Sequence, residues 1–184
     1  MERLKEALSA AGIAYKENEP LCAHCTFRIG GPADLFVLPE NEEQLCAAIR
    51  LAKEAGVKSY LLGNGSNILF EDAGYRGAVI NVSAMKSGIG VIENISFPGK
   101  DPALTYDAVV VGAGQMLSSL CMAALENSLT GLEFAYGIPG TVGGAVYMNA
   151  GAYGGEMKDV LTTVRYLAAE GEVREVPAAE LDLR

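Results

Sequence analysis

The hydrophobic pattern of the first half of the chain predicts a helix followed by a β-α-β unit. Between residues 2 and 11, apolar side chains recur three and four positions apart and Gly12 follows, which predicts a short amphipathic helix with a glycine stop. The apolar run 34–38 predicts a buried strand that Pro39 ends, and the run 57–62 predicts the next strand.

The helix between these two strands has a signal at each end. Asn41 is a suitable N-cap, Gln44 completes a capping-box pattern, and Lys53 lies near the carboxyl end. Gly56 follows as the stop, and the second strand of the unit runs directly into Gly63. The apolar stripe of the helix consists of Leu45, Ala48, Ile49 and Ala52.

The second half has more strands and one clear helix. The further predicted strands are 78–82, 107–111, 159–168 and 172–176. Residues 89–106 are less regular, with an exposed hairpin or loop expected around Ser96–Ala103, and the stretch Ile95–Thr105 is long for a connection between two strands. The helix after Gly114 is predicted to bury Leu117, Leu120, Cys121, Ala124 and Leu125. Residues 177–181 are typical of the first turn of a helix.

Composition restricts the class of protein. The 184 residues carry 14 Lys and Arg against 23 Asp and Glu, a net charge of −9, and half of them are apolar. Such a chain buries a core and is not disordered, and it lacks the basic face that nucleic acid or an anionic membrane would require. The N-terminus mixes charges with leucine, unlike a signal peptide, so we expect a cytoplasmic protein. The stretch Phe134–Gly155 has no charge, but its glycines argue against a membrane span and predict a loop region.

The single histidine lies in Cys22-Ala-His24-Cys25, which invites comparison with metal and redox sites. A zinc site usually needs two such pairs, whereas Cys46 and Cys121 stand singly. No nucleophile motif accompanies His24 either. We therefore expect ordinary thiols near a loop and no metal.

The segment Gly63-Asn-Gly-Ser-Asn-Ile68 favours phosphate binding. It lacks the third small residue of a dinucleotide fingerprint, and the chain contains no ATP-type phosphate loop. However, its glycines leave main-chain N–H groups unobstructed, and Ser66 and Asn67 add side-chain donors. A protein of net charge −9 that binds an anion through main-chain dipoles needs no basic patch. The alternative is a tight surface turn.

Glycine is concentrated in a second segment, where eight of the 22 glycines lie between Gly131 and Gly155. Glycine is costly in ordered structure unless a turn requires it or a ligand approaches the backbone closely. The absence of charge suits an apolar ring system, whose polar edge Tyr136, Thr141, Asn149 and Tyr153 could satisfy. Buried turns packed on a sheet are the alternative.

Four segments together resemble one enzyme family. They are Thr26–Asp34, Leu62–Leu69, Gly137–Ala145 and Met148–Gly154. In this order and spacing they are similar to the FAD-binding portion of bacterial UDP-N-acetylenolpyruvoylglucosamine reductases (UDP-N-acetylmuramate dehydrogenases) of the second, shorter type, within the wider vanillyl-alcohol-oxidase-type flavin fold. The resemblance covers about residues 13–184. It implies an FAD-dependent oxidoreductase of peptidoglycan precursor synthesis, in which NADPH reduces the flavin and the flavin then reduces UDP-N-acetylenolpyruvoylglucosamine to UDP-N-acetylmuramate.

The resemblance also implies which residues bind non-covalent FAD. The pyrophosphate would lie against Gly63, Asn64, Gly65, Ser66, Asn67 and Ile68. The flavin and ribityl chain would lie along Gly137, Ile138, Pro139, Gly140, Thr141, Gly143, Gly144, Ala145, Asn149, Gly151, Ala152 and Tyr153. Arg28 matches the family motif without an assigned role. No nucleic acid, membrane or obligate protein partner is implied.

The family's catalytic arginine, serine and glutamate would all lie beyond Arg184, in or next to a substrate domain that this chain is expected to lack. The 184 residues alone are therefore expected to be inactive. We predict an α+β architecture with an N-terminal helix at 1–12, a first FAD-binding subdomain at 13–82, and a second at 83–184 with a mixed, mostly antiparallel sheet and helices. There are two alternative functions. One is a flavin oxidase of the same fold that acts on another small substrate, and the other is a non-catalytic nucleotide-binding module.

Overall fold

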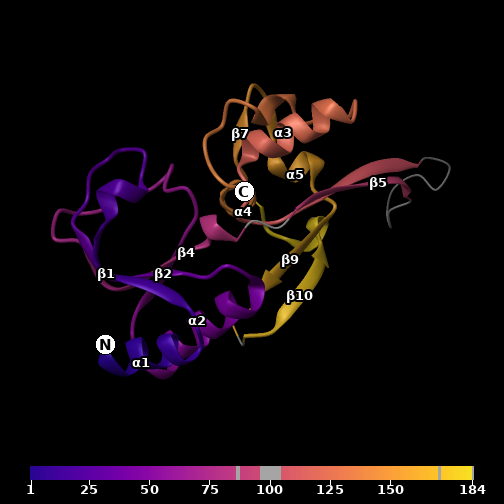
Figure 1. Ribbon diagram of the computed structural model, residues 1–184. Helices are drawn as coiled ribbons and strands as arrows, with labels where there is room; N and C mark the ends of the chain where they lie inside the picture. The colour runs from indigo at the N-terminus through magenta and orange to yellow at the C-terminus, as the bar shows by residue number, and fades with distance from the viewer. Residues whose placement is uncertain (86–87, 96–104, 170, 184) are drawn as a thin grey trace. The chain divides into compact units, whose positions relative to one another are not determined.

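The computed structural model describes residues 1–85, 88–95, 105–169 and 171–183 (Figure 1). The chain divides into two compact units, Met1–Lys86 and Ser87–Arg184. The helices and strands of both units together give the predicted α+β class. Within the described residues, no helix is long and apolar enough to cross a membrane.

Unit 1 is built on a four-stranded sheet of order β1-β2-β4-β3. Its strands are β1 (Ala14–Pro20), β2 (Pro32–Leu38), β3 (Ser59–Leu62) and β4 (Tyr75–Asn81). Strand β1 pairs antiparallel with β2, whereas β4 is parallel to both β2 and β3. The predicted β-α-β unit is therefore confirmed as β2-α2-β3, with β4 inserted between its two strands.

Alternate residues of β2 point to opposite faces of the sheet, and other elements cover both faces. On one face, helices α1 (Glu2–Ala10) and α2 (Glu42–Glu54) bury a cluster with Leu35 and Val37, and Figure 1 shows both helices on the same side of the strands. On the other face, Phe36 packs against the short 3₁₀ helix η1 (Leu21–His24) and the connection after β3.

The predicted helix ends of unit 1 are confirmed. The Asn41 side chain accepts a hydrogen bond of 2.9 Å from the Gln44 N–H at the start of α2, and the Gln44 side chain accepts one from the Glu40 N–H. Gly12 and Gly56, just past the ends of α1 and α2, both have a φ of +66°, the left-handed conformation that glycine adopts readily.

The strands of unit 2 pair antiparallel, as predicted, but its described residues form three separate two-stranded sheets. The strands are β5 (Ile89–Ile95), β6 (Tyr106–Val111), β7 (Gly151–Ala152), β8 (Gly155–Glu156), β9 (Thr163–Leu167) and β10 (Val173–Pro177). The loop expected at Ser96–Ala103 lies outside the described residues.

The helices of unit 2 surround its core. They are α3 (Leu117–Glu126), α4 (Val142–Tyr147) and α5 (Met157–Val160), with 3₁₀ turns η3 (Glu133–Ala135) and η4 (Ala178–Glu180); a further 3₁₀ turn, η2 (Val82–Ala84), closes unit 1. Four residues of α3 are buried as predicted: Leu117, Leu120, Cys121 and Ala124. The prediction that Leu125 is buried is wrong, because this residue of the last turn of α3 is 68% exposed. Two further corrections concern a strand start and a loop. The strand predicted from 159 begins at Thr163 because α5 precedes it, and the glycine-rich segment contains α4 where a loop was expected.

Candidate functional site

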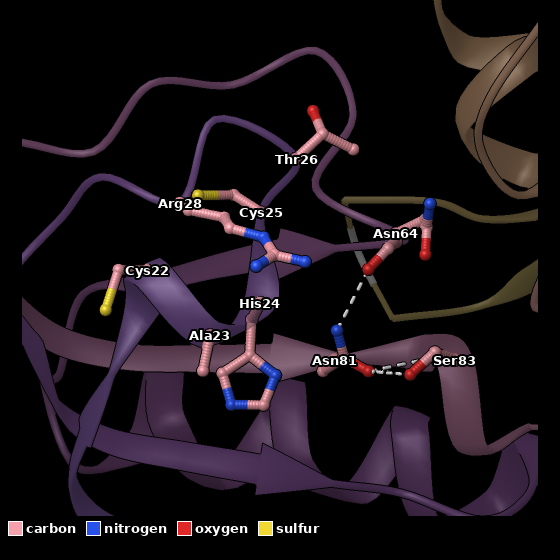
Figure 2. Close-up of a pocket in the computed structure, with 10 residues that line it drawn as sticks. Cys22, Ala23, His24, Cys25, Thr26, Arg28, Asn64, Asn81 and Ser83 are labelled. Carbon is pink, nitrogen blue, oxygen red and sulfur yellow. Dashed lines mark hydrogen bonds between the residues drawn. The ribbon is translucent and has the colours of Figure 1, made fainter.

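A pocket of about 730 Å³ opens in unit 1 at the carboxyl ends of two parallel strands. Strands β3 and β4 end side by side, and ligands of α/β sheets commonly bind at such an edge. The volume is typical of a small-molecule site. Ten residues line the pocket (Figure 2): Cys22, Ala23, His24, Cys25, Thr26, Arg28, Gly63, Asn64, Asn81 and Ser83.

The loop after β3 forms one wall of this pocket and packs tightly on the segment after η1. Gly65 has a φ of +65°, and a Cβ atom there would lie 2.1 Å from the His24 carbonyl oxygen. The Thr26 N–H donates a hydrogen bond of 3.0 Å to the Gly65 carbonyl. Only glycine fits this close approach, so the second glycine of Gly63-Asn-Gly65 is explained by contact between two main chains.

Asn81, the last residue of β4, holds the same loop from the other side and is itself bonded by Ser83. The Asn81 amide group donates a hydrogen bond of 2.9 Å to the Gly63 carbonyl, and its side-chain oxygen accepts from the Ser83 N–H at 3.1 Å (Figure 2). Asn81 is 4% exposed. Sequence reasoning missed both Asn81 and Ser83. The sequence offers one signal for this site, because Asn81 is a polar residue at the end of a buried strand. That strand lies parallel to β3, which ends just before Gly63.

These contacts leave hydrogen-bond donors at the pocket. In the part of the chain that the structure describes, the main-chain N–H groups of Asn64 and Gly65 donate to no other protein group. None of the ten lining residues is acidic, and Arg28 contributes a guanidinium. Free donors together with a cation, in a pocket without carboxylates, favour an anionic ligand.

His24 is occupied by contacts within the protein. Its Nε2 lies 2.8 Å from Glu19 Oε1, and its ring stacks on Phe36 with centroids 4.0 Å apart. The pKa of the Glu19 carboxyl lies below its usual value because Lys16 and, second, His24 form hydrogen bonds with it. Among the described residues, no group of three or more His, Cys, Asp and Glu side chains could hold a metal ion. His24 thus positions η1 on the sheet, and among the described residues none of the four cysteines forms a disulfide.

The glycine-rich segment of unit 2 uses many of its own main-chain donors. The N–H groups of Val142 and Gly143 donate to the Gln115 and Ala113 carbonyls, and the Thr141 hydroxyl caps the Gly144 N–H at 3.3 Å. A Cβ atom on Gly143 would lie 2.7 Å from the Ala113 Cβ. Close packing therefore explains this glycine, and these N–H groups are not available to an anion.

A second pocket, of about 410 Å³, lies in the β7–β8 region. Its lining residues are Asn149, Gly151, Ala152, Gly154, Gly155 and Glu156. The Asn149 side chain donates to Glu156 at 2.7 Å and accepts from the Lys158 N–H at 2.9 Å, which holds its backbone at a φ of +44°. Asn149 therefore fixes the shape of this pocket from within the protein.

The predicted cofactor residues are distributed over both pockets and their surroundings. Gly63 and Asn64 line the first pocket, and Asn149, Gly151 and Ala152 line the second. Ile68 packs against the core of unit 1. Tyr153 is 97% exposed at the β7–β8 turn, and a Cβ atom on Gly137 would meet nothing within 4 Å.

Comparison with known proteins finds a matching family and similar enzymes. Residues 33–177 match a protein family described as FAD binding domain. The UDP-N-acetylenolpyruvoylglucosamine reductase of Agathobacter rectalis is 46% identical over 185 residues, which cover 100% of this chain and 57% of that protein.

Two solved structures have a similar fold. The UDP-N-acetylenolpyruvylglucosamine reductase of Thermus caldophilus is 30% identical, with a TM-score of 0.66 over 94% of this chain and 55% of its own. A VAO-type flavoprotein of Myceliophthora thermophila C1, at 17% identity and a TM-score of 0.64, covers 80% of this chain and 27% of its own, and shows likeness of fold alone. The chain thus spans about half the length of the reductases that it matches.

Proposed function

Since the chain belongs to the FAD binding domain family, we propose that it binds FAD non-covalently as the flavin-binding part of a UDP-N-acetylenolpyruvoylglucosamine reductase. Similarity to such a reductase along the whole chain supports the choice within this fold. The observation that carries the proposal is the pocket of unit 1, because it presents unpaired main-chain donors and no carboxylate where the sequence motif predicts phosphate.

The residues of the first pocket fit the pyrophosphate part of such a cofactor. The N–H groups of Asn64 and Gly65 are donors without a protein acceptor in the described residues, and main-chain groups of this kind bind phosphate well. The hydrogen bonds from Asn81 and Thr26 hold the loop in place before any ligand arrives. Preorganised donors reduce the entropy cost of binding.

We place the flavin ring and ribityl chain along the second segment, Gly137–Tyr153. Open space beside Gly137 would let a flat ring approach the backbone, and the exposed side chains of Tyr136 and Tyr153 offer aromatic contact. Since the N–H groups of Val142 and Gly143 are used within the protein, ring binding here would rest on surface contact more than on main-chain hydrogen bonds.

For the whole protein we propose NADPH as hydride donor and UDP-N-acetylenolpyruvoylglucosamine as substrate, with UDP-N-acetylmuramate for peptidoglycan as product. When bound, FAD would carry hydride between the two, while this chain binds and orients it. We also propose a cytoplasmic location, which four cysteines without a disulfide in the described residues support.

Equilibrium dialysis of the purified chain against FAD tests the proposal. We expect saturable FAD binding, competition by ADP, and weaker binding of riboflavin, because riboflavin lacks phosphate. Flavin should be released in full when the protein is denatured, since no covalent bond is expected. A folded chain that takes up no FAD would refute the proposal and favour a non-flavin nucleotide-binding module.

A further inference from the structure

The pocket of unit 1 also contains a cationic side chain, Arg28, which does not belong to the Gly63–Ile68 loop. Arg28 lies in the turn after η1, where its N–H donates to the Cys25 carbonyl at 3.2 Å and the Cys25 thiol donates to the Ile29 carbonyl at 3.3 Å. These bonds hold Arg28 at a φ of +55°. This left-handed conformation is uncommon for residues other than glycine and costs roughly 1 kcal/mol or more, a cost found most often at functional sites.

The side chain of Arg28 enters the pocket from this turn. Figure 2 shows its guanidinium extending toward the side where Asn64 and Asn81 lie. In the described portion of the chain, no carboxylate or other acceptor binds this guanidinium. By contrast, Arg50 and Arg76 each lie 3.0 Å from a carboxylate oxygen. The Arg28 charge is therefore available to a ligand.

We infer that Arg28 is an anion-binding residue that contacts a phosphate group of the dinucleotide held at the Asn64–Gly65 loop, an inference that rests on the proposed function. A guanidinium presents a planar fork of donors that matches two phosphate oxygens, and the adjacent N–H groups of Asn64 and Gly65 supply further donors. In a protein of net charge −9, a local cation also offsets the repulsion that a diphosphate meets. This proposal differs from the expectation that main-chain dipoles alone bind the anion.

The test compares variants of Arg28 for binding of FAD, ADP, riboflavin and inorganic pyrophosphate by isothermal titration calorimetry. Arg28→Gln removes the charge, and Arg28→Asn removes it with a residue that tolerates positive φ. Arg28→Lys keeps the charge but loses the fork. Arg50→Gln, on the exposed face of α2, is the control for net charge.

We expect FAD, ADP and pyrophosphate to bind about 10- to 100-fold more weakly to Arg28→Gln and Arg28→Asn, the range for a lost charge-assisted hydrogen bond. Arg28→Lys should fall between these variants and the unaltered chain. Riboflavin binding should not change. Far-UV circular dichroism and thermal unfolding establish that each variant is folded.

A second measurement uses the unaltered chain and so avoids any folding defect. Pyrophosphate and FAD should slow the modification of Arg28 by phenylglyoxal, mapped by peptide mass spectrometry, and should leave Arg50 unaffected.

The outcomes separate the two proposals. Unchanged FAD and pyrophosphate affinity in folded Arg28 variants, or an equal loss for riboflavin, would overturn the role of Arg28 and leave flavin binding intact. Arg28-dependent binding of pyrophosphate without any FAD binding would refute the proposed function and support the anion site. Absence of binding for every phosphate-bearing probe, with no protection of Arg28, would overturn both.

Discussion

Replacing Gly65 by alanine tests the contact on which the first pocket depends. The new Cβ atom would lie 2.1 Å from the His24 carbonyl oxygen and 2.8 Å from the Cys25 Cα, separations that real Cβ atoms essentially never show. Both neighbours are main-chain atoms, so the loop must move by on the order of 1 Å because a packed interior cannot absorb the overlap. That movement would break the hydrogen bond from the Thr26 N–H to the Gly65 carbonyl.

Gly56→Ala is a matched control in the same unit. Gly56 has a φ of +66°, almost the same as the +65° of Gly65, but a Cβ atom there meets nothing within 4 Å. The control therefore reports the cost of left-handed alanine alone, about 1 kcal/mol, part of which the lower entropy of the unfolded chain offsets. Gly65→Ala adds overlap and a lost hydrogen bond, so we expect about 2–3 kcal/mol in total.

Urea unfolding followed by circular dichroism measures both variants, and FAD binding to the folded forms measures the effect on the loop. We expect Gly65→Ala to lose FAD affinity and Gly56→Ala to retain it. Equal losses of unfolding free energy in the two variants would refute the close packing of the loop on His24. A stability loss without any change in FAD affinity would instead show that the loop does not bind the cofactor.

Three further predictions concern single side chains. Asn149→Ala removes the hydrogen bonds to Glu156 and Lys158, and should destabilise the protein by about 2–3 kcal/mol more than Asn18→Ala. Asn18 is the control because it has the same left-handed backbone but is exposed. Thermal and urea unfolding measure the difference in unfolding free energy. Burial raises the pKa of the Cys121 thiol and lowers its thiolate fraction, so iodoacetamide should modify it more slowly at pH 8 than the partly exposed Cys46; peptide mass spectrometry would contradict this if the two rates were equal. The lowered pKa of Glu19 means that its carboxylate stabilises the fold above the ordinary pKa of a glutamate and ceases to do so as pH falls through the lowered value. Glu19→Gln should therefore be destabilising at neutral pH and indistinguishable from the unaltered chain in acid, and unfolding curves at a series of pH values would contradict this if the difference stayed constant.

The parts of the fold that the sequence predicts well depend on local chemistry. The ends of α2 follow from Asn41, whose side chain accepts the N–H three residues on, and from Gly56, which adopts positive φ without cost. The hydrophobic run of β2 likewise predicts a strand because both faces of that strand are covered.

The parts that were missed depend on partners distant in sequence. Strand β1 is largely polar because it is an edge strand, so its pairing with β2 leaves little trace in the pattern. Helix α4 forms in spite of two glycines because Thr141 caps it and Val142 is buried in the core. The hydrogen bond from Asn81 to Gly63 joins residues 18 positions apart and arises only once β3 and β4 lie parallel.

The division of the chain into two units, each with its own buried core, has a consequence for affinity. One part of the proposed contact surface belongs to Met1–Lys86 and the other to Ser87–Arg184. The Asn64–Gly65 loop lies wholly within the first unit, so a compound that carries only the phosphate end should bind without any residue of the second unit. Substitutions between Gly137 and Tyr153 should then lower the affinity for FAD and leave the affinity for inorganic pyrophosphate unchanged.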